Sequence, residues 1–148
     1  MTCDAHDLRA VMDSYFGGSD ERYRHTFNRR FIYSAGVQDV AKTAGAFWFI
    51  DKVALEIAPI FSAIWQKNEG SHGIIKLSVP ADDAPERPVI TMTMDDAAEP
   101  VYRFELDFTT FPAGDWTFLL GMDYEGDMLS DEIDVSKYVT NMYLLPEY

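Results

Sequence analysis

The sequence predicts an α+β protein in which N-terminal helices pack on one face of an antiparallel sheet of about five strands. Apolar residues recur with helical spacing before residue 68, and they alternate with polar residues, as in strands, after residue 72. The connections between the alternating segments are short, which favours antiparallel neighbours. For 148 residues without a linker-like stretch, we expect one domain, with a helical part over about 4–67 and a sheet part over about 72–148.

The first helix is expected over residues 4–16. Asp4 suits the N-cap position, and Gly17-Gly18 supplies the stop. Its apolar stripe has i, i+3, i+4, i+7 spacing and consists of Leu8, Val11, Met12 and Tyr15.

A polar connection is expected over residues 19–30, and residues 31–33 form a short strand or an extended lead-in segment. The second helical region covers residues 37–58. Gly45 weakens a single continuous helix there, so two stacked helices are an alternative. Pro59 marks a boundary, because the residue before a proline is biased away from helical geometry, and it suits the start of another short helix ending at Trp65.

The second half of the chain shows the two-residue alternation of strands. Clusters of turn residues separate the alternating segments, and residues 123–134 are expected to form an acidic loop or a short helix. The predicted strands are Gly73–Val79, Val89–Met94, Val101–Phe108, Trp116–Leu120 and Tyr138–Leu145.

All of the net charge lies in the second half. Residues 1–76 carry nine basic and nine acidic residues, whereas residues 77–148 carry three basic and sixteen acidic ones, which equals the whole formal charge of −13. Such a balance argues against direct nucleic-acid binding, which needs Lys and Arg to neutralise phosphates. We therefore expect a protein-interaction module with an acidic face for a basic partner. Its expected contact residues are Asp82, Asp83, Glu86, Asp95, Asp96, Glu99, Asp123, Glu125, Asp127, Asp131, Glu132 and Asp134.

A basic cluster offers an alternative ligand site. Arginine suits bidentate binding of carboxylate or phosphate, so a small-ligand or enzyme site between helices and sheet, with Trp48 in its wall, is one interpretation. In the other interpretation the arginines pair with the carboxylates of this same protein. The cluster consists of Arg22, Tyr23, Arg24, His25, Arg29 and Arg30.

No catalytic residue, metal site or cofactor is predicted. His6, His25 and His72 lie too far apart for the short ligand spacings of a zinc site, and the acidic run does not match the register of a helix-loop-helix calcium loop. An enzyme is therefore the less favoured class. The single cysteine, the lack of an apolar membrane-spanning stretch and the lack of a secretory pattern at the N-terminus lead us to expect a cytoplasmic protein.

Aromatic residues of the helical half are expected in the core, since Phe and Trp dominate interior packing, although one side of this stripe could instead be a partner surface. The stripe consists of Phe47, Trp48, Phe49, Phe61 and Trp65. A plainer alternative is a housekeeping interaction domain, with a homodimer through an edge strand such as Tyr138–Leu145.

Several segments also resemble one family. They occur in order over most of the chain and are residues 21–25, 28–33, 36–41, 44–51, 108–112 and 143–148. The family is a domain of unknown function among small bacterial, plasmid and phage proteins, and residues 123–137 look like an extra acidic insertion within it. The resemblance implies a mobile-element context and assigns no catalytic residue. In that context we expect an inhibitor that mimics nucleic acid and occupies the basic surface of a host nuclease or defence complex.

Overall fold

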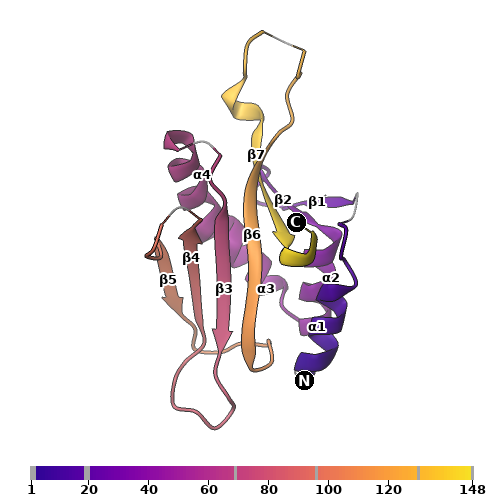
Figure 1. Cartoon of the computed structure of the whole chain (residues 1–148), viewed down its shortest axis with the longest axis vertical. Helices are drawn as coiled ribbons and strands as arrows, with labels where there is room; N and C mark the ends of the chain where they lie inside the picture. Colours follow the sequence, from indigo (N-terminus) through magenta and orange to yellow (C-terminus); the bar gives the residue numbers. More distant parts are fainter. Residues whose placement is uncertain (1–2, 19–20, 69, 96, 130, 148) are drawn as a thin grey trace.

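The computed structural model of the chain describes residues 3–18, 21–68, 70–95, 97–129 and 131–147. Within these residues, the helices lie on one side of a single sheet (Figure 1). The α+β class predicted from the sequence is therefore confirmed. In the described part of the chain the sheet has seven strands in the order β1-β2-β7-β6-β3-β4-β5, so the prediction of about five strands is too low.

Helices dominate the first half of the chain and strands the second. The first half contains α1 (Ala5–Asp13), β1 (Arg22–Arg24), β2 (Phe31–Ser34), α2 (Ala35–Ala44), α3 (Phe47–Lys52), the π-helical turn η1 (Val53–Ile57) and α4 (Ala58–Lys67). The second half contains β3 (Gly73–Val79), β4 (Val89–Met94), β5 (Tyr102–Glu105), β6 (Gly114–Tyr124), the 3-10 turn η2 (Val135–Lys137), β7 (Tyr138–Leu144) and the 3-10 turn η3 (Leu145–Glu147).

Strands β1 and β2 account for the difference in strand number. The three residues of β1 lie within the segment predicted as a polar connection, and they pair antiparallel with β2. Strand β2 in turn pairs parallel with β7, with Phe31 opposite Thr140, so the sheet is mixed rather than wholly antiparallel. The three residues of β1 show too little alternation for a strand to be recognised in the sequence. The parallel pairing of β2 with β7 joins segments from opposite halves of the chain, which local spacing does not predict.

Strand β7 is an interior strand. It lies between β2 and β6, and the edges of the sheet are β1 and β5. The prediction that Tyr138–Leu145 is an edge strand is therefore wrong, because β2 pairs with the side of β7 that would be open in a five-stranded sheet. A dimer through an exposed edge of β7 is excluded by this placement.

The helical region is divided at Gly45, as in the alternative of two helices, and a further helix, α4, starts beside Pro59 as expected but follows the π-helical turn η1 directly. Gly45 adopts a left-handed conformation with φ of 62° and ends α2. Residues 47–67 remain helical through Pro59. Because proline lacks an N–H and crowds the carbonyl four residues earlier, the chain widens into η1, where the Ala58 N–H donates to the Val53 carbonyl.

The core lies between the helices and one face of the sheet. Alternate residues of β6 face the helices, and the largest fully buried side chains include Trp116 and Phe118 of β6, Phe31 of β2, and Phe49 and Phe61 of the helices. The aromatic prediction is thus confirmed for Phe49 and Phe61, whereas Phe47 is exposed. None of the helices in the described residues is long and apolar enough to cross a membrane.

The connection from β6 to β7 projects past the end of the sheet, at the top of Figure 1. We call its described residues, 125–129 and 131–137, the acidic extension. They contain the η2 turn and coincide with most of the acidic segment that the sequence predicts as a loop or short helix.

Candidate partner-binding surface

The predicted contact carboxylates lie at two opposite ends of the sheet. Asp82, Asp83 and Glu86 lie in the β3–β4 connection, beyond the end where Val79 pairs with Gly114. The other described members lie beyond the end where Gly73 pairs with Leu120: Asp95, Glu99, Asp123, Glu125, Asp127, Asp131, Glu132 and Asp134. All eleven are exposed, and Asp96 lies outside the described residues. The carboxylates therefore form two groups, of which the group around the acidic extension is the larger.

The acidic extension also exposes apolar side chains between its carboxylates. Met128 and Leu129 are 77% and 94% exposed, and Ile133 and Val135 are each more than half exposed. Exposed apolar groups surrounded by charge are typical of interaction surfaces. The carboxylates of this segment could be predicted from the sequence, whereas its apolar residues were not predicted, although their alternation with acidic residues at 132–135 is visible in the sequence.

Local hydrogen bonds give the acidic extension its shape. The Leu129 N–H donates to Asp127 Oδ1 over 2.9 Å, which closes a turn at the tip. Asp134 Oδ1 accepts from the Ser136 hydroxyl and backbone N–H and so caps η2. The Ser136 hydroxyl, followed by its N–H, lowers the pKa of the Asp134 carboxyl. The Asp134 N–H donates to the Tyr124 hydroxyl, which links the extension back to β6.

Arginines of the β1–β2 hairpin hold the base of the acidic extension. Arg24 forms an ion pair with Glu125. The Arg30 guanidinium donates to two backbone carbonyls, those of Val135 over 3.0 Å and Tyr138 over 3.4 Å. Arg24 thus pairs with a carboxylate of this chain, as in the interpretation that the arginines pair with the protein's own carboxylates, whereas Arg30 binds backbone carbonyls instead.

The other members of the basic cluster also make contacts within the chain. Both ring nitrogens of His25 are engaged: Nδ1 accepts from the backbone N–H groups of Phe27 and Asn28, and Nε2 lies 2.7 Å from Asp51 Oδ1. Since two donors point at Nδ1, the proton resides on Nε2 and is donated to Asp51.

The remaining three side chains of the cluster are placed as follows. The Tyr23 ring stacks on Tyr33 at 5.8 Å, and one guanidinium nitrogen each of Arg22 and Arg29 donates to a backbone carbonyl. Trp48, the expected wall of the alternative site, donates its indole N–H to Thr110 Oγ1 and packs against Phe111.

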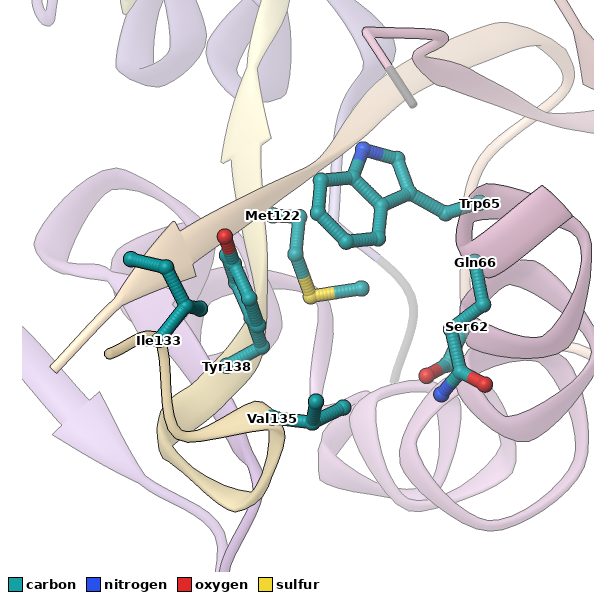
Figure 2. A pocket seen from close by; sticks show the side chains of 7 residues that line it. All are labelled: Ser62, Trp65, Gln66, Met122, Ile133, Val135 and Tyr138. Atoms are coloured by element: carbon teal, nitrogen blue, oxygen red, sulfur yellow. The ribbon is translucent and has the colours of Figure 1, made fainter. Parts of the chain in front are cut away.

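A cavity of about 480 Å³ lies between α4 and the acidic extension. Figure 2 shows Ser62, Trp65 and Gln66 on the α4 side and Ile133, Val135 and Tyr138 opposite, with Met122 between them. The ring centroids of Trp65 and Tyr138 are 4.9 Å apart. The ring of Tyr124, on β6, lies at the same centroid distance from the ring of Tyr138. We call this cavity the α4 pocket. Its walls are mostly apolar, so it suits an apolar group.

The α4 pocket continues toward the β1–β2 hairpin. A smaller cavity of about 190 Å³ shares Ser62 and Tyr138 with it and is lined further by Asn28, Arg30, Ala58, Pro59 and Thr140. This pocket was not predicted from the sequence, although one side of the aromatic stripe that ends at Trp65 was expected as an alternative partner surface. Trp65 and Tyr138 are far apart in the chain, so no local spacing brings them together.

The three histidines each lie beside a different aspartate: His6 beside Asp7, His25 beside Asp51, and His72 beside Asp95. In the part of the chain that the structure describes, no three His, Cys, Asp or Glu side chains come together as metal ligands.

Comparison with known proteins gives one positive finding. The model of a family described as "Family of unknown function (DUF6876)" matches residues 12–147. No curated protein and no solved structure matches the chain.

Proposed function

We propose that this chain, which belongs to the family of unknown function DUF6876, is a protein-interaction module whose acidic extension binds a basic partner protein. The observation that carries the proposal is the composition and position of this segment. It projects past the sheet and exposes five carboxylates together with Met128, Leu129, Ile133 and Val135.

Charge and apolar surface have different effects on binding. Carboxylates attract a basic partner over several ångströms and raise the association rate, while buried apolar area supplies most of the affinity. The β3–β4 connection has three candidate carboxylates, Asp82, Asp83 and Glu86, and none of the exposed large apolar residues of the described chain. This difference favours the acidic extension as the contact surface.

The finer form of the proposal concerns the partner. We propose a cytoplasmic inhibitor that occupies the basic nucleic-acid-binding surface of a host nuclease or defence complex. A formal charge of −13 and the resemblance to bacterial, plasmid and phage proteins support this form. Carboxylates would meet the arginines and lysines that otherwise hold phosphates.

The alternative site around Arg24, His25 and Trp48 ranks second. A ligand there would compete with the ion pair from Arg24 to Glu125 and with the contacts of both His25 nitrogens. A housekeeping homodimer also ranks below the proposal, because two copies that each carry a formal net charge of −13 repel one another.

Two matched variants test the proposal. One neutralises the extension by Asp127→Asn, Asp131→Asn and Glu132→Gln, and the other neutralises the β3–β4 connection by Asp82→Asn, Asp83→Asn and Glu86→Gln. Both raise the formal charge by three. Each is immobilised and used for affinity capture from a bacterial lysate at low and at high salt.

We expect wild type and the β3–β4 variant to retain the same basic protein at low salt and to release it at high salt, because salt screens exposed charges. The extension variant should retain much less of it. Equal capture by both variants, or equal loss in both, would contradict the proposal.

Competition tests the finer form. If the partner's basic surface normally binds nucleic acid, excess double-stranded DNA should displace the captured partner from the acidic extension. A partner that stays bound under excess DNA would refute nucleic-acid mimicry.

A further inference from the structure

We infer that the α4 pocket receives one apolar side chain, aromatic or long aliphatic, from a basic segment of the partner that lies along the acidic extension. This inference rests on the proposed function and adds to it the chemistry of the contact. It depends on the walls of the pocket, on their fixed position and on the charges around them.

The walls favour an uncharged occupant. The described residues that line the α4 pocket include no carboxylate, and their polar groups are the neutral side chains of Ser62 and Gln66 and the hydroxyl of Tyr138. Arg30 lines the smaller cavity that shares Ser62 and Tyr138 with it, and its guanidinium donates to the carbonyls of Val135 and Tyr138. A lysine or arginine head inside the pocket would find no counter-charge and would face Arg30, whereas an apolar side chain would be removed from water against Trp65 and Met122.

The walls are held in place before any partner binds. Tyr138 lies between the rings of Trp65 and Tyr124, each 4.9 Å away. The Asp134 N–H donates to the Tyr124 hydroxyl, and Arg30 binds the carbonyls of Val135 and Tyr138. The α4 pocket therefore needs little ordering on binding, which preserves affinity.

Gly126 contributes to this fixed wall. A Cβ atom at residue 126 would clash with the Tyr124 hydroxyl, so any larger residue displaces the ring that supports Tyr138. The acidic extension thus depends on a small residue at this position for its contact with β6.

The surrounding charges select a basic segment. Ile133 and Val135 line the α4 pocket, and Glu132 and Asp134 are their exposed neighbours in the chain. A partner segment that inserts an apolar residue between Trp65 and Val135 therefore carries its adjacent residues past carboxylates. A second copy of this chain is disfavoured as the occupant by its own charge of −13. The volume of about 480 Å³ is ample for one large side chain.

Two peptides test the inference with the full chain. One has the sequence Lys-Lys-Phe-Lys-Lys and the other Lys-Lys-Gly-Lys-Lys, so both carry the same charge. Binding is followed by heteronuclear NMR through the indole N–H signal of Trp65, which is assigned by its loss in Trp65→Phe. We expect the Phe peptide to bind about tenfold more tightly, since burial of one Phe side chain supplies at least that factor.

A matched pair of variants locates the extra affinity. Ser62→Phe places a ring into the α4 pocket, whereas Ala63→Phe places the same ring on the exposed side of α4. The advantage of the Phe peptide should disappear in Ser62→Phe and persist in Ala63→Phe. Thermal unfolding shows whether each variant is folded, and the comparison of the two peptides on wild type decides the inference even if Ser62→Phe does not fold.

The outcomes separate the inference from the proposed function. Equal binding of both peptides to wild type would overturn the inference and leave the basic-partner proposal standing. An equal advantage of the Phe peptide in Ser62→Phe would also overturn it. Failure of both peptides to bind would overturn the basic-partner proposal along with it.

Discussion

His25 shows how one side chain of the predicted ligand cluster serves the fold. Its Nδ1 accepts from the N–H groups of Phe27 and Asn28, and its Nε2 donates to Asp51 at the end of α3. We predict that His25→Ala lowers the free energy of unfolding by about 2 kcal/mol or more. Two backbone donors lose their acceptor, and removal of the buried ring leaves a cavity. Urea unfolding measures the change.

Asp51→Asn is the control for His25. The amide keeps an oxygen that can accept from Nε2, so we expect a loss of less than about 1 kcal/mol. Equal losses in the two variants would show that the hydrogen bond from Nε2 to Asp51, rather than the contacts of Nδ1, stabilises the hairpin.

Two tyrosines should make stability depend on alkaline pH. Burial, followed by the hydrogen bond to Asp39, raises the pKa of Tyr15 to about 12. Burial, followed by the charge of Glu56, raises the pKa of Tyr102 to about 12. Since the pKa of tyrosine in an unfolded chain is about 10, the stabilisation is fully present below about pH 10 and is lost as the pH rises to about 12.

Tyr15→Phe and Tyr102→Phe test this dependence. Each variant removes one hydroxyl whose pKa is raised. Each should therefore lose less unfolding free energy than wild type between about pH 10 and pH 12. Urea unfolding at a series of pH values gives the slopes. Slopes equal to that of wild type would mean that these hydroxyls titrate no later than in the unfolded chain.

At the level of elements, the β1–β2 hairpin and the acidic extension form a connected unit. We predict that Arg30→Ala speeds hydrogen exchange in residues 131–137, because the carbonyls of Val135 and Tyr138 lose their donor. Arg103→Ala is the matched control, since Arg103 pairs with Glu105 on the edge strand β5. Similar exchange in wild type and Arg30→Ala would show that the extension is held by its own turns.

Elements with strong local signals could be predicted, and those made by distant pairing could not. The bounds of β3 and β4 follow their alternation, Asp4 acts as the expected N-cap, and Gly45 divides the helical region as in the alternative of two helices. The three residues of β1 become a strand only because β2 lies beside them, and β2 is positioned by β7 from the other end of the chain. The π-helical turn before Pro59 depends on continued packing of a helix that local preference would end.

For the whole molecule, charge composition indicates a partner but not where it binds. Successive connections of an antiparallel sheet alternate between its two ends, so the acidic β3–β4 connection cannot lie beside the acidic extension. In the sequence these carboxylates belong to one acidic half of the chain, but the sheet topology places them in two groups at opposite ends of the sheet. The α4 pocket lies beyond sequence reasoning for a related reason, since α4, β6 and β7 meet there only after the sheet has formed.

The most direct test of the account asks which of the two carboxylate groups a basic ligand contacts. Backbone amide signals of the full chain are mapped by NMR during titration with the Lys-Lys-Phe-Lys-Lys peptide. We expect the largest shifts in the acidic extension and in the α4 residues that face it, with small shifts at residues 80–88. Shifts of equal size in the β3–β4 connection, or shifts spread over every acidic loop, would contradict it.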